Sequence, residues 1–296
     1  MSGGITRGIV LAGGSGNRLY PMTNVACKQL LPVYDKPMIY YPLSTLMLFG
    51  VKNILIISTP SDTPRMRELL GDGHQLGINL TYAVQPKPNG IAEAITIGAD
   101  FVGRDPFALI LGDNIFYGNY DFLREARSFR DGAMIFTYVV RHPERYGVVT
   151  FDRAGQPVTI VEKPTSPVSH HAVTGLYIYD SEAVGIARAL KPSARGELEI
   201  TDVNRAYLER GKLRAVQLGR GIAWLDTGTP EDMVSAGEFV ATIEKRQGQK
   251  VACLEEVAYR MGYISRLELK SLAENLPASD YRKYLIGVVE DGDNVK

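Results

Sequence analysis

The segment with the strongest pattern lies near the start, where residues 8–37 read GIVLAGGSGNRLYPMTNVACKQLLPVYDKP. Its first five residues form a short apolar run, which is typical of a buried parallel strand. The loop that follows holds three glycines, Gly13, Gly14 and Gly16. Glycines there let backbone N–H groups approach a bulky anion, and Arg18 and Lys28 add two cations suited to phosphate oxygens. The segment therefore predicts a strand and loop that bind phosphate.

Other glycine-rich loops differ in spacing. A P-loop needs Gly-Lys followed by Ser or Thr, and no such pair follows this loop. A dinucleotide-binding fingerprint needs a third glycine where this chain has Leu19. A plain tight turn between a strand and a helix stays an alternative.

Composition narrows the class of protein. The 296 residues carry 33 Lys+Arg and 33 Asp+Glu, so the net charge is zero and a general nucleic-acid or membrane-surface binder is not expected. No apolar run is long enough to span a membrane. The two cysteines, Cys27 and Cys253, have neither disulfide-framework nor zinc spacing. We expect a cytoplasmic protein that binds phosphate through a few placed cations.

Apolar periodicity predicts alternating strands and helices in the first part of the chain. Strands are expected at 53–58, 78–85 and 107–111, and helices at 38–49, 63–70 and 91–101. This order predicts an α/β fold with a Rossmann-like, mostly parallel central sheet flanked by helices. Ligands on such sheets bind beyond the carboxyl ends of the strands, where the glycine loop, Gln85 and Asp113 would meet.

The rhythm changes after residue 130. Strands are expected at 133–141, 146–152, 158–162, 173–179, 213–218 and 223–226, and helices at 182–190, at 201–210 with Thr201 as cap, from Pro230 onward and at 254–276. We interpret this as a more antiparallel inserted β region and a helical C-terminal part. We expect one main unit at residues 1–250 and a C-terminal part at 251–296. The main unit is divided into a first part of about 1–130 and a second part of about 131–230.

Two aspartates, Asp113 and Asp226, each follow a buried apolar run. A carboxylate in that position needs a cationic partner, and two of them could converge on one Mg²⁺ ion. Alternatively, each caps the helix that follows it. Glu162 and Lys163 are adjacent in a predicted strand, so they are expected on opposite faces, and a solvated pair at the sheet edge is the simple alternative.

The motifs GGSGNRLYPMT and KQLLPVYDKPMIYYP resemble those of the sugar-nucleotide pyrophosphorylases, and within them the glucose-1-phosphate thymidylyltransferases. Similar stretches continue to about residue 260. Asn17 and Cys27 depart from the usual Thr and from the usual small or hydroxyl residue, but neither removes a charge. The resemblance implies a reaction of dTTP with α-D-glucose 1-phosphate that gives dTDP-glucose and pyrophosphate. A uridylyltransferase, or another sugar-phosphate nucleotidyltransferase of the same fold, is the alternative.

The resemblance also implies roles for individual residues. Catalytic positions are Arg18, Lys28 and Lys163; substrate-binding positions are Gly13, Gly14, Gly16, Gln85, Gly90, Asp113, Tyr146, Gly147, Glu162, Val173 and Trp224; Mg²⁺ is held by Asp113 and Asp226. Gln85 and Gly90 match the base-binding segment, where Gly90 would leave room for the ring. Lys163 would hold the sugar phosphate.

The family further implies a place in metabolism and a form of regulation. The reaction would be the first step of dTDP-L-rhamnose synthesis for the lipopolysaccharide O-antigen. A homotetramer is expected, with allosteric inhibition by dTDP-rhamnose at a second nucleotide site. Tyr117-Gly118 and the region near Arg260 are the candidates for that site.

Overall fold

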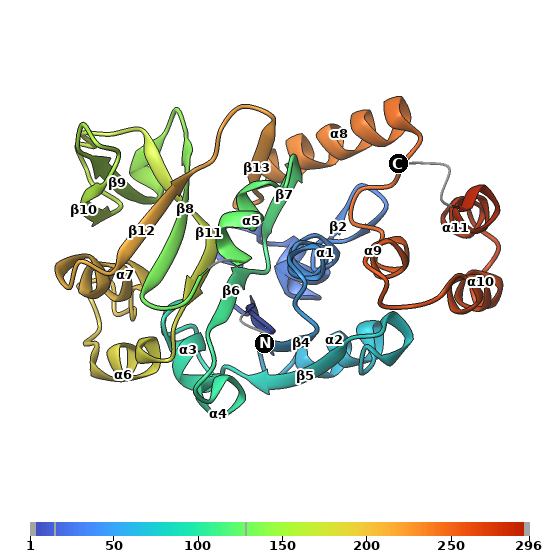
Figure 1. The fold of residues 1–296 in the computed structure, drawn as a ribbon, viewed down its shortest axis with the longest axis horizontal. Helices are drawn as coiled ribbons and strands as arrows, with labels where there is room; N and C mark the ends of the chain where they lie inside the picture. Colours follow the sequence, from blue (N-terminus) through green and yellow to red (C-terminus); the bar gives the residue numbers. More distant parts are fainter. Residues whose placement is uncertain (1–3, 15, 128, 293–296) are drawn as a thin grey trace.

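The computed structural model describes residues 4–14, 16–127 and 129–292. Its central sheet runs in the order β10-β9-β11-β6-β1-β4-β5, and β8 and β12 continue it beside β11 (Figure 1). Four strands are mutually parallel: β1 (Arg7–Ala12), β4 (Asn53–Ser58), β5 (Asn79–Val84) and β6 (Phe107–Leu111). The α/β prediction with a mostly parallel centre and flanking helices is confirmed.

Strand β1 lies at the centre of the sheet because both of its faces are apolar. Val10 belongs to a core cluster with Leu43 and Leu46 of the helix α1 (Tyr40–Phe49), whereas Ile9 and Leu11 belong to a second cluster on the other face. Alternate side chains of a strand point to opposite faces, so a continuous apolar run is required where both faces are covered. The carboxyl end of β1 thereby fixes where the glycine loop emerges.

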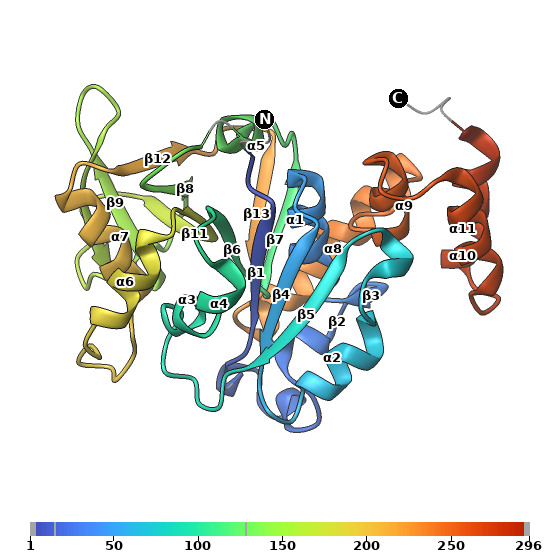
Figure 2. The ribbon, with the colours of Figure 1, turned by 60° about the horizontal axis from the view of Figure 1, so that its bottom comes forward.

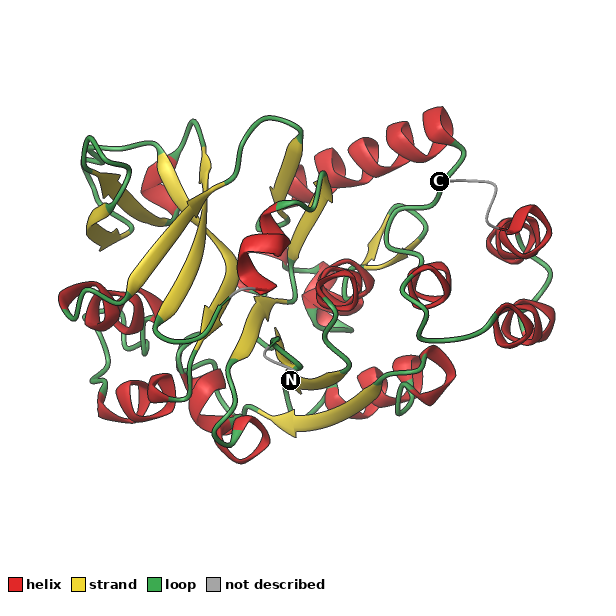
Figure 3. Ribbon diagram, viewed as in Figure 1, coloured by secondary structure: helices red, strands yellow, loops and turns green. Residues whose placement is uncertain are grey.

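The inserted β region joins the sheet in a more antiparallel manner. It comprises β8 (Ala133–Val139), β9 (Gly147–Phe151), β10 (Pro157–Glu162), β11 (His171–Tyr179) and β12 (Leu213–Gln217). Strand β11 is antiparallel to β6, β8 and β9, and β12 is parallel to β8. Figure 3 shows this region as a twisted continuation of the central strands.

A separate two-stranded sheet was not predicted in full. Strand β13 (Ile222–Asp226) was expected, but its antiparallel partner β7 (Asn114–Gly118) directly follows Asp113 and was missed. In this pairing Asp226 lies opposite Asn114. A smaller hairpin pairs β2 (Pro32–Val33) with β3 (Lys36–Pro37).

Helices cover both faces of the central sheet (Figures 1 and 2). They are α1 (Tyr40–Phe49), α2 (Thr63–Leu70), α3 (Glu93–Ile97), α4 (Ala99–Val102), α5 (Phe122–Arg127), α6 (Glu182–Ala189) and α7 (Ile200–Glu209). Helix α8 (Pro230–Gln247) packs instead against β2 and β13 of the two small sheets. The single helix predicted at 91–101 is two short helices separated at Gly98. The predicted cap at Thr201 is also wrong, because Glu199 takes the N-cap position of α7 and Thr201 lies within the helix.

The C-terminal part contains α9 (Leu254–Arg260), α10 (Arg266–Asn275) and α11 (Asp280–Asp291), which follow α8 (Figure 2). The predicted helical stretch at 254–276 is interrupted because Ser265 begins α10 with a reciprocal capping box to Glu268. Helix α11 was not predicted. None of the helices in the described part of the chain combines the length and apolar character needed to cross a membrane.

Candidate active site

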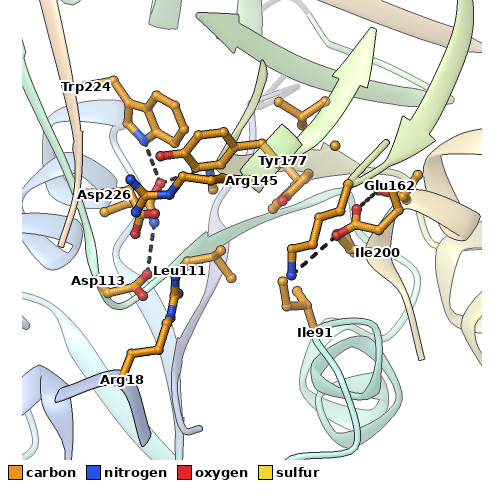
Figure 4. Close-up of a pocket in the computed structure, with 17 residues that line it drawn as sticks. Arg18, Ile91, Leu111, Asp113, Arg145, Glu162, Tyr177, Ile200, Trp224 and Asp226 are labelled. Atoms are coloured by element: carbon orange, nitrogen blue, oxygen red, sulfur yellow. Dashed lines mark hydrogen bonds and ion pairs between the residues drawn. The ribbon is translucent and has the colours of Figure 1, made fainter. Parts of the chain in front are cut away.

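Two adjoining cavities lie at the carboxyl ends of the central strands. One, of about 200 Å³, is bounded by the inserted β region and by β13, and the other, of about 430 Å³, is bounded by the glycine loop. Arg18, Asp113 and Lys163 line both cavities. Figure 4 shows Asp113, Asp226 and Trp224 on one side of the first cavity and Glu162 on the other.

The glycine loop has backbone conformations and close approaches that require glycine. Gly14 has φ 121° and Gly16 has φ 57°, both in the left-handed half of the map. A Cβ atom on Gly16 would lie 2.7 Å from the Thr23 side chain, and one on Gly13 would lie 2.9 Å from Oε1 of Gln85. All three glycines line the larger cavity, so the loop exposes its backbone to that space.

The two cations of the first segment occupy different environments. Arg18 is exposed, its guanidinium packs against Gly228, and among the described residues it has neither a hydrogen bond nor an ion pair. Lys28 is only 8% exposed, and its Nζ lies 2.7 Å from Oδ2 of Asp113. Arg18 is therefore free to meet an anion in the cavity, whereas Lys28 neutralises a carboxylate at the cavity wall.

Asp113 and Asp226 line the same cavity, and the pKa values of their carboxyl groups are shifted in opposite directions. Burial acts to raise the pKa of Asp113, but the Lys28 ammonium and the hydrogen bond from Asn114 outweigh it and hold that pKa below its usual value. Burial, together with repulsion from Asp113, raises the pKa of Asp226 to about 6. The helix-cap alternative is wrong for both, because Asp113 precedes a strand and Thr229 caps α8.

The two carboxylates form an incomplete metal site. In the described part of the chain, no group of three or more His, Cys, Asp and Glu side chains could hold an ion by itself. Mg²⁺ commonly takes one or two carboxylates and completes its shell with water and substrate phosphate. The repulsion that raises the pKa of Asp226 is also what a divalent cation would relieve. The residues present fit Mg²⁺ bound together with a phosphate.

Glu162 and Lys163 do not lie on opposite faces, so that prediction is wrong. Strand β10 ends at Glu162, and Lys163 has φ 42°, which turns its side chain back toward the cavity. Lys163 Nζ lies 3.8 Å from Oε1 of Glu162. A left-handed residue at a strand end breaks the alternation on which the prediction rested.

The walls of the smaller cavity come from several segments that lie far apart in the chain. Tyr146, Gly147, Val173 and Trp224, which the resemblance assigns to substrate binding, all line it. The rings of Tyr146 and Trp224 lie 5.2 Å apart between centroids. A Cβ atom on Gly147 would lie 3.0 Å from Oγ1 of Thr201 and 3.4 Å from Oε2 of Glu162, so glycine keeps this wall open.

Gln85 and Gly90 lie together beyond the rim of the two cavities. Nε2 of Gln85 donates hydrogen bonds to the carbonyl of Gly90 at 3.2 Å and to Glu93 at 2.7 Å. From the sequence, a glycine is expected at position 90 in order to leave room for the ring of the base, but the structure gives another reason. A Cβ atom there would lie 2.4 Å from the Leu198 carbonyl oxygen, and φ is 116°, so Gly90 admits the neighbouring backbone.

Several lining residues have no role in the site predicted from the sequence. They are Asn114, Arg145, Tyr177, Ile200 and Thr201. Arg195 pairs with Glu199 at 2.7 Å and with Glu162 at 3.4 Å. Thr201 donates a hydrogen bond to Glu162 from the first turn of α7. These lining residues reach the cavity from β7, β11, α7 and the turn at 143–145, so only the tertiary structure brings them together.

The two candidate regulatory segments lie near the end of α8. Tyr117 donates a hydrogen bond to Gln247 at 2.6 Å. Arg260 lines a cavity of about 250 Å³ together with Gly248 and Gln249, the residues that follow α8. The two segments are thus connected through one helix end.

Comparison with known proteins agrees with this geometry. The model of the nucleotidyl transferase family matches residues 7–243. Glucose-1-phosphate thymidylyltransferases from Xanthomonas campestris pv. campestris and Neisseria meningitidis serogroup A are 56% and 53% identical over 288 and 286 residues. These alignments cover 97% and 96% of this chain and 98% and 99% of the relatives.

Solved structures give the same result. A Bacillus anthracis structure described as a glucose-1-phosphate thymidylyltransferase in complex with sucrose is 42% identical with a TM-score of 0.74, and covers 79% of this chain and 94% of that one. A UDP-glucose pyrophosphorylase complexed with UDP-glucose is 25% identical with a TM-score of 0.71, and covers 82% of this chain and 100% of that one. This chain belongs to the nucleotidyl transferase family and, within it, to the glucose-1-phosphate thymidylyltransferases.

Proposed function

We propose that the protein converts dTTP and α-D-glucose 1-phosphate to dTDP-glucose and pyrophosphate at the two adjoining cavities. The observation that carries the proposal is their junction, where Arg18, Asp113 and Lys163 line both spaces. A nucleotide triphosphate in the glycine-loop cavity and a sugar phosphate in the smaller one would meet at that junction. The names of the close relatives support the choice of substrates.

The chemistry asked of the chain is positioning and charge neutralisation. In-line attack of a sugar-phosphate oxygen on the α-phosphorus needs no covalent intermediate with the protein. Lys163 would hold the attacking phosphate, and Arg18, which has no partner among the described residues, would hold the pyrophosphate that leaves. Lys28 would lie along the phosphates, and the amides of Gly13, Gly14 and Gly16 would face them.

Asp113 and Asp226 would hold Mg²⁺, which when bound supplies a Lewis acid against phosphoryl oxygens. The hydrogen-bonded pair of Glu162 and Thr201 would bind sugar hydroxyls beside Tyr146, Gly147, Val173 and Trp224. Gln85 offers an amide edge suited to a pyrimidine, next to Gly90. In these assignments the role of each residue comes from the family resemblance, and its position comes from the structure of this chain.

The biological setting is part of the proposal. We place the reaction at the start of dTDP-L-rhamnose synthesis for an O-antigen, in the cytoplasm. We propose a homotetramer inhibited by dTDP-rhamnose, with the regulatory site between Tyr117 and Arg260, near the end of α8. Size measurement by analytical ultracentrifugation tests the tetramer, and inhibition by dTDP-rhamnose that is lost in Arg260→Ala tests the site.

A second candidate differs only in the base. The likeness to a UDP-glucose pyrophosphorylase favours UTP as the alternative nucleotide. Pyrophosphate release should be measured with glucose 1-phosphate and Mg²⁺ for dTTP, UTP, CTP, ATP and GTP. We expect the highest kcat/KM with dTTP, a lower value with UTP and none without metal. Preference for UTP would establish the alternative, and no release with any nucleotide would refute both.

A further inference from the structure

A buried carboxamide, that of Asn114, connects three elements at the back of the smaller cavity. Its Oδ1 accepts hydrogen bonds from the Trp224 indole N–H at 2.6 Å and from the Gly175 backbone N–H at 2.9 Å. Its Nδ2 donates to Oδ1 of Asp113 at 2.9 Å. Two N–H donors can point only at the carbonyl end of an amide, so the orientation of this side chain is determined by its partners.

The Gly175 end of the connection is built into β11. The pairing of β11 with β8 is irregular between Val173 and Tyr177, which directs the Gly175 N–H out of the ladder and toward Asn114. A Cβ atom on Gly175 would lie 2.6 Å from the Asn114 side chain. A glycine at position 175 therefore meets two needs of the Asn114 side chain. Its backbone N–H is a hydrogen-bond donor, and its missing side chain leaves the space that the carboxamide occupies.

The Trp224 end reaches the cavity that would hold the sugar. The indole is 8% exposed, lines that cavity and packs against Tyr146 and Tyr138. Trp224 and Asp226 are two apart in β13, so they point to the same side, and Asp226 lies opposite Asn114 in the β7–β13 pair. Figure 4 shows Trp224, Asp226 and Asp113 along one wall.

The Asp113 end is fixed at both oxygens. Oδ2 meets the Lys28 ammonium at 2.7 Å, and Oδ1 accepts from Asn114. Hydrogen bonds to a ligating carboxylate set its orientation, and their loss commonly reduces metal affinity about 10- to 100-fold. Asn114 thus contacts the proposed metal ligand and, through Trp224, a wall of the sugar cavity.

We propose that Asn114 is a positioning residue that couples occupancy of the sugar cavity to metal binding, through the chain Trp224 Nε1–H to Asn114 to Asp113. The inference rests on the proposed function, because it takes Asp113 as a metal ligand and Trp224 as a sugar contact. A sugar phosphate that fixes the indole also fixes the amide and the carboxylate beyond it. By linkage, metal binding then favours sugar-phosphate binding to the same extent.

The chain contains one tryptophan, so its fluorescence reports on this position directly. Mn²⁺ is the probe, because a paramagnetic ion quenches a nearby indole. Quenching of the nucleotide-free enzyme is titrated with and without glucose 1-phosphate, for the wild type and for Asn114→Ala. We expect glucose 1-phosphate to tighten Mn²⁺ binding in the wild type. Asn114→Ala should weaken it about tenfold and abolish the effect of the sugar phosphate.

Two further variants separate positioning from general loss of structure. Asn204→Ala removes another buried asparagine, which accepts a hydrogen bond from Tyr179 away from the cavity, and should leave Mn²⁺ binding and its sugar dependence unchanged. Trp224→Phe removes only the N–H donor and part of the ring. It should raise the Mg²⁺ concentration for half-maximal rate, whereas loss of packing alone would raise only KM for glucose 1-phosphate.

The inference is overturned if folded Asn114→Ala binds Mn²⁺ as the wild type does and keeps the same sugar dependence. It is also overturned if glucose 1-phosphate leaves Mn²⁺ binding to a fully active wild type unchanged. Failure of the proposed function would look different, since the wild type would then release no pyrophosphate with any nucleotide.

Discussion

Asp113 and Asp226 are close in space but have opposite electrostatic balances. Asp113 is paired with Lys28 at 2.7 Å, whereas Asp226 is buried near a second carboxylate and its pKa rises to about 6. Folding stability alone would not favour an ionised carboxylate at residue 226, because burial and the nearby Asp113 both oppose its charge. Such residues occur where function requires a charge that stability does not favour.

Asp226→Asn should therefore stabilise the metal-free protein at pH 8 by about 3 kcal/mol, because a carboxyl whose pKa is raised to about 6 costs about that much when it is ionised. The gain should fall as the pH drops through 6 and vanish below 4, since the folded wild type takes up its proton in that window. Urea unfolding at several pH values measures both effects. An unchanged or lower stability at pH 8 would refute the assignment.

Asp113→Asn should have the opposite effect on stability. It leaves the buried Lys28 ammonium without its carboxylate, which should destabilise the protein by about 3 kcal/mol at pH 8. Both substitutions should lower kcat at least about 100-fold if each carboxylate holds the metal. Asp100→Asn, an exposed change in α4, is the control for both assays.

Lys163 is held at the cavity junction by a left-handed backbone conformation. Lys163→Ala should raise KM for glucose 1-phosphate at least about tenfold more than KM for dTTP, because the lost ammonium would contact the sugar phosphate. Initial rates with each substrate varied in turn measure the ratio. Equal increases in both constants would place Lys163 elsewhere, and Lys87→Ala on the exposed loop after β5 is the control.

At the scale of elements, the end of α8 is tied to the β2–β3 hairpin by buried charges. Glu244 accepts hydrogen bonds from Lys36 Nζ at 3.0 Å, from the Val251 N–H at 2.9 Å and from Lys250 Nζ at 3.2 Å. A carboxylate in the last turn of a helix opposes the helix dipole, so its partners must compensate for that cost. This cluster fixes the helix that follows the Asp226 loop.

Glu244→Gln should lower the free energy of unfolding by about 2 kcal/mol, because the Lys36 ammonium, 3% exposed, then keeps only Asp35 as a counter-charge. Adding Lys36→Met to that variant should restore much of the loss. Urea unfolding of the two single variants and the double variant gives the coupling energy. Glu238→Gln, an exposed site on the same helix, should be neutral, and an equal loss there would argue against the cluster.

At the scale of the molecule, the C-terminal helices complete the core beside α1. Leu254 and Ala258 of α9 are buried in the same cluster as Leu46 and Met47, and the Tyr263 hydroxyl donates to the Met47 carbonyl at 2.8 Å. The sequence predicts a separate C-terminal part at 251–296. These contacts argue that its first helix is needed by the part before it.

A chain that ends at residue 250 should therefore lose stability, with a thermal midpoint lower by more than about 10 °C, because several apolar side chains of α1 become exposed. Thermal unfolding and soluble yield measure the effect. A chain that ends at residue 292 is the control. A wild-type midpoint for the shorter chain would show that the C-terminal part is an independent appendage.

Local pattern determined much of the architecture. The apolar run before Gly13 predicts a strand buried on both faces, and helix–strand alternation predicts the parallel sheet, because both signals depend on periods of two and 3.6 residues. The strand β7 was missed because its partner β13 lies more than a hundred residues later in the chain. The turn at Lys163 was missed because the backbone leaves the strand there.

The fold class, the glycine-rich loop after β1 and the family could all be predicted from the sequence, since each depends on residues that are adjacent or regularly spaced. The tertiary structure decided which charges meet. It pairs Lys28 with Asp113, brings Asp226 opposite Asn114, and leaves Arg18 without a hydrogen bond or ion pair among the described residues. Burial and Coulomb interactions depend on distance through space, and distance along the chain does not fix that.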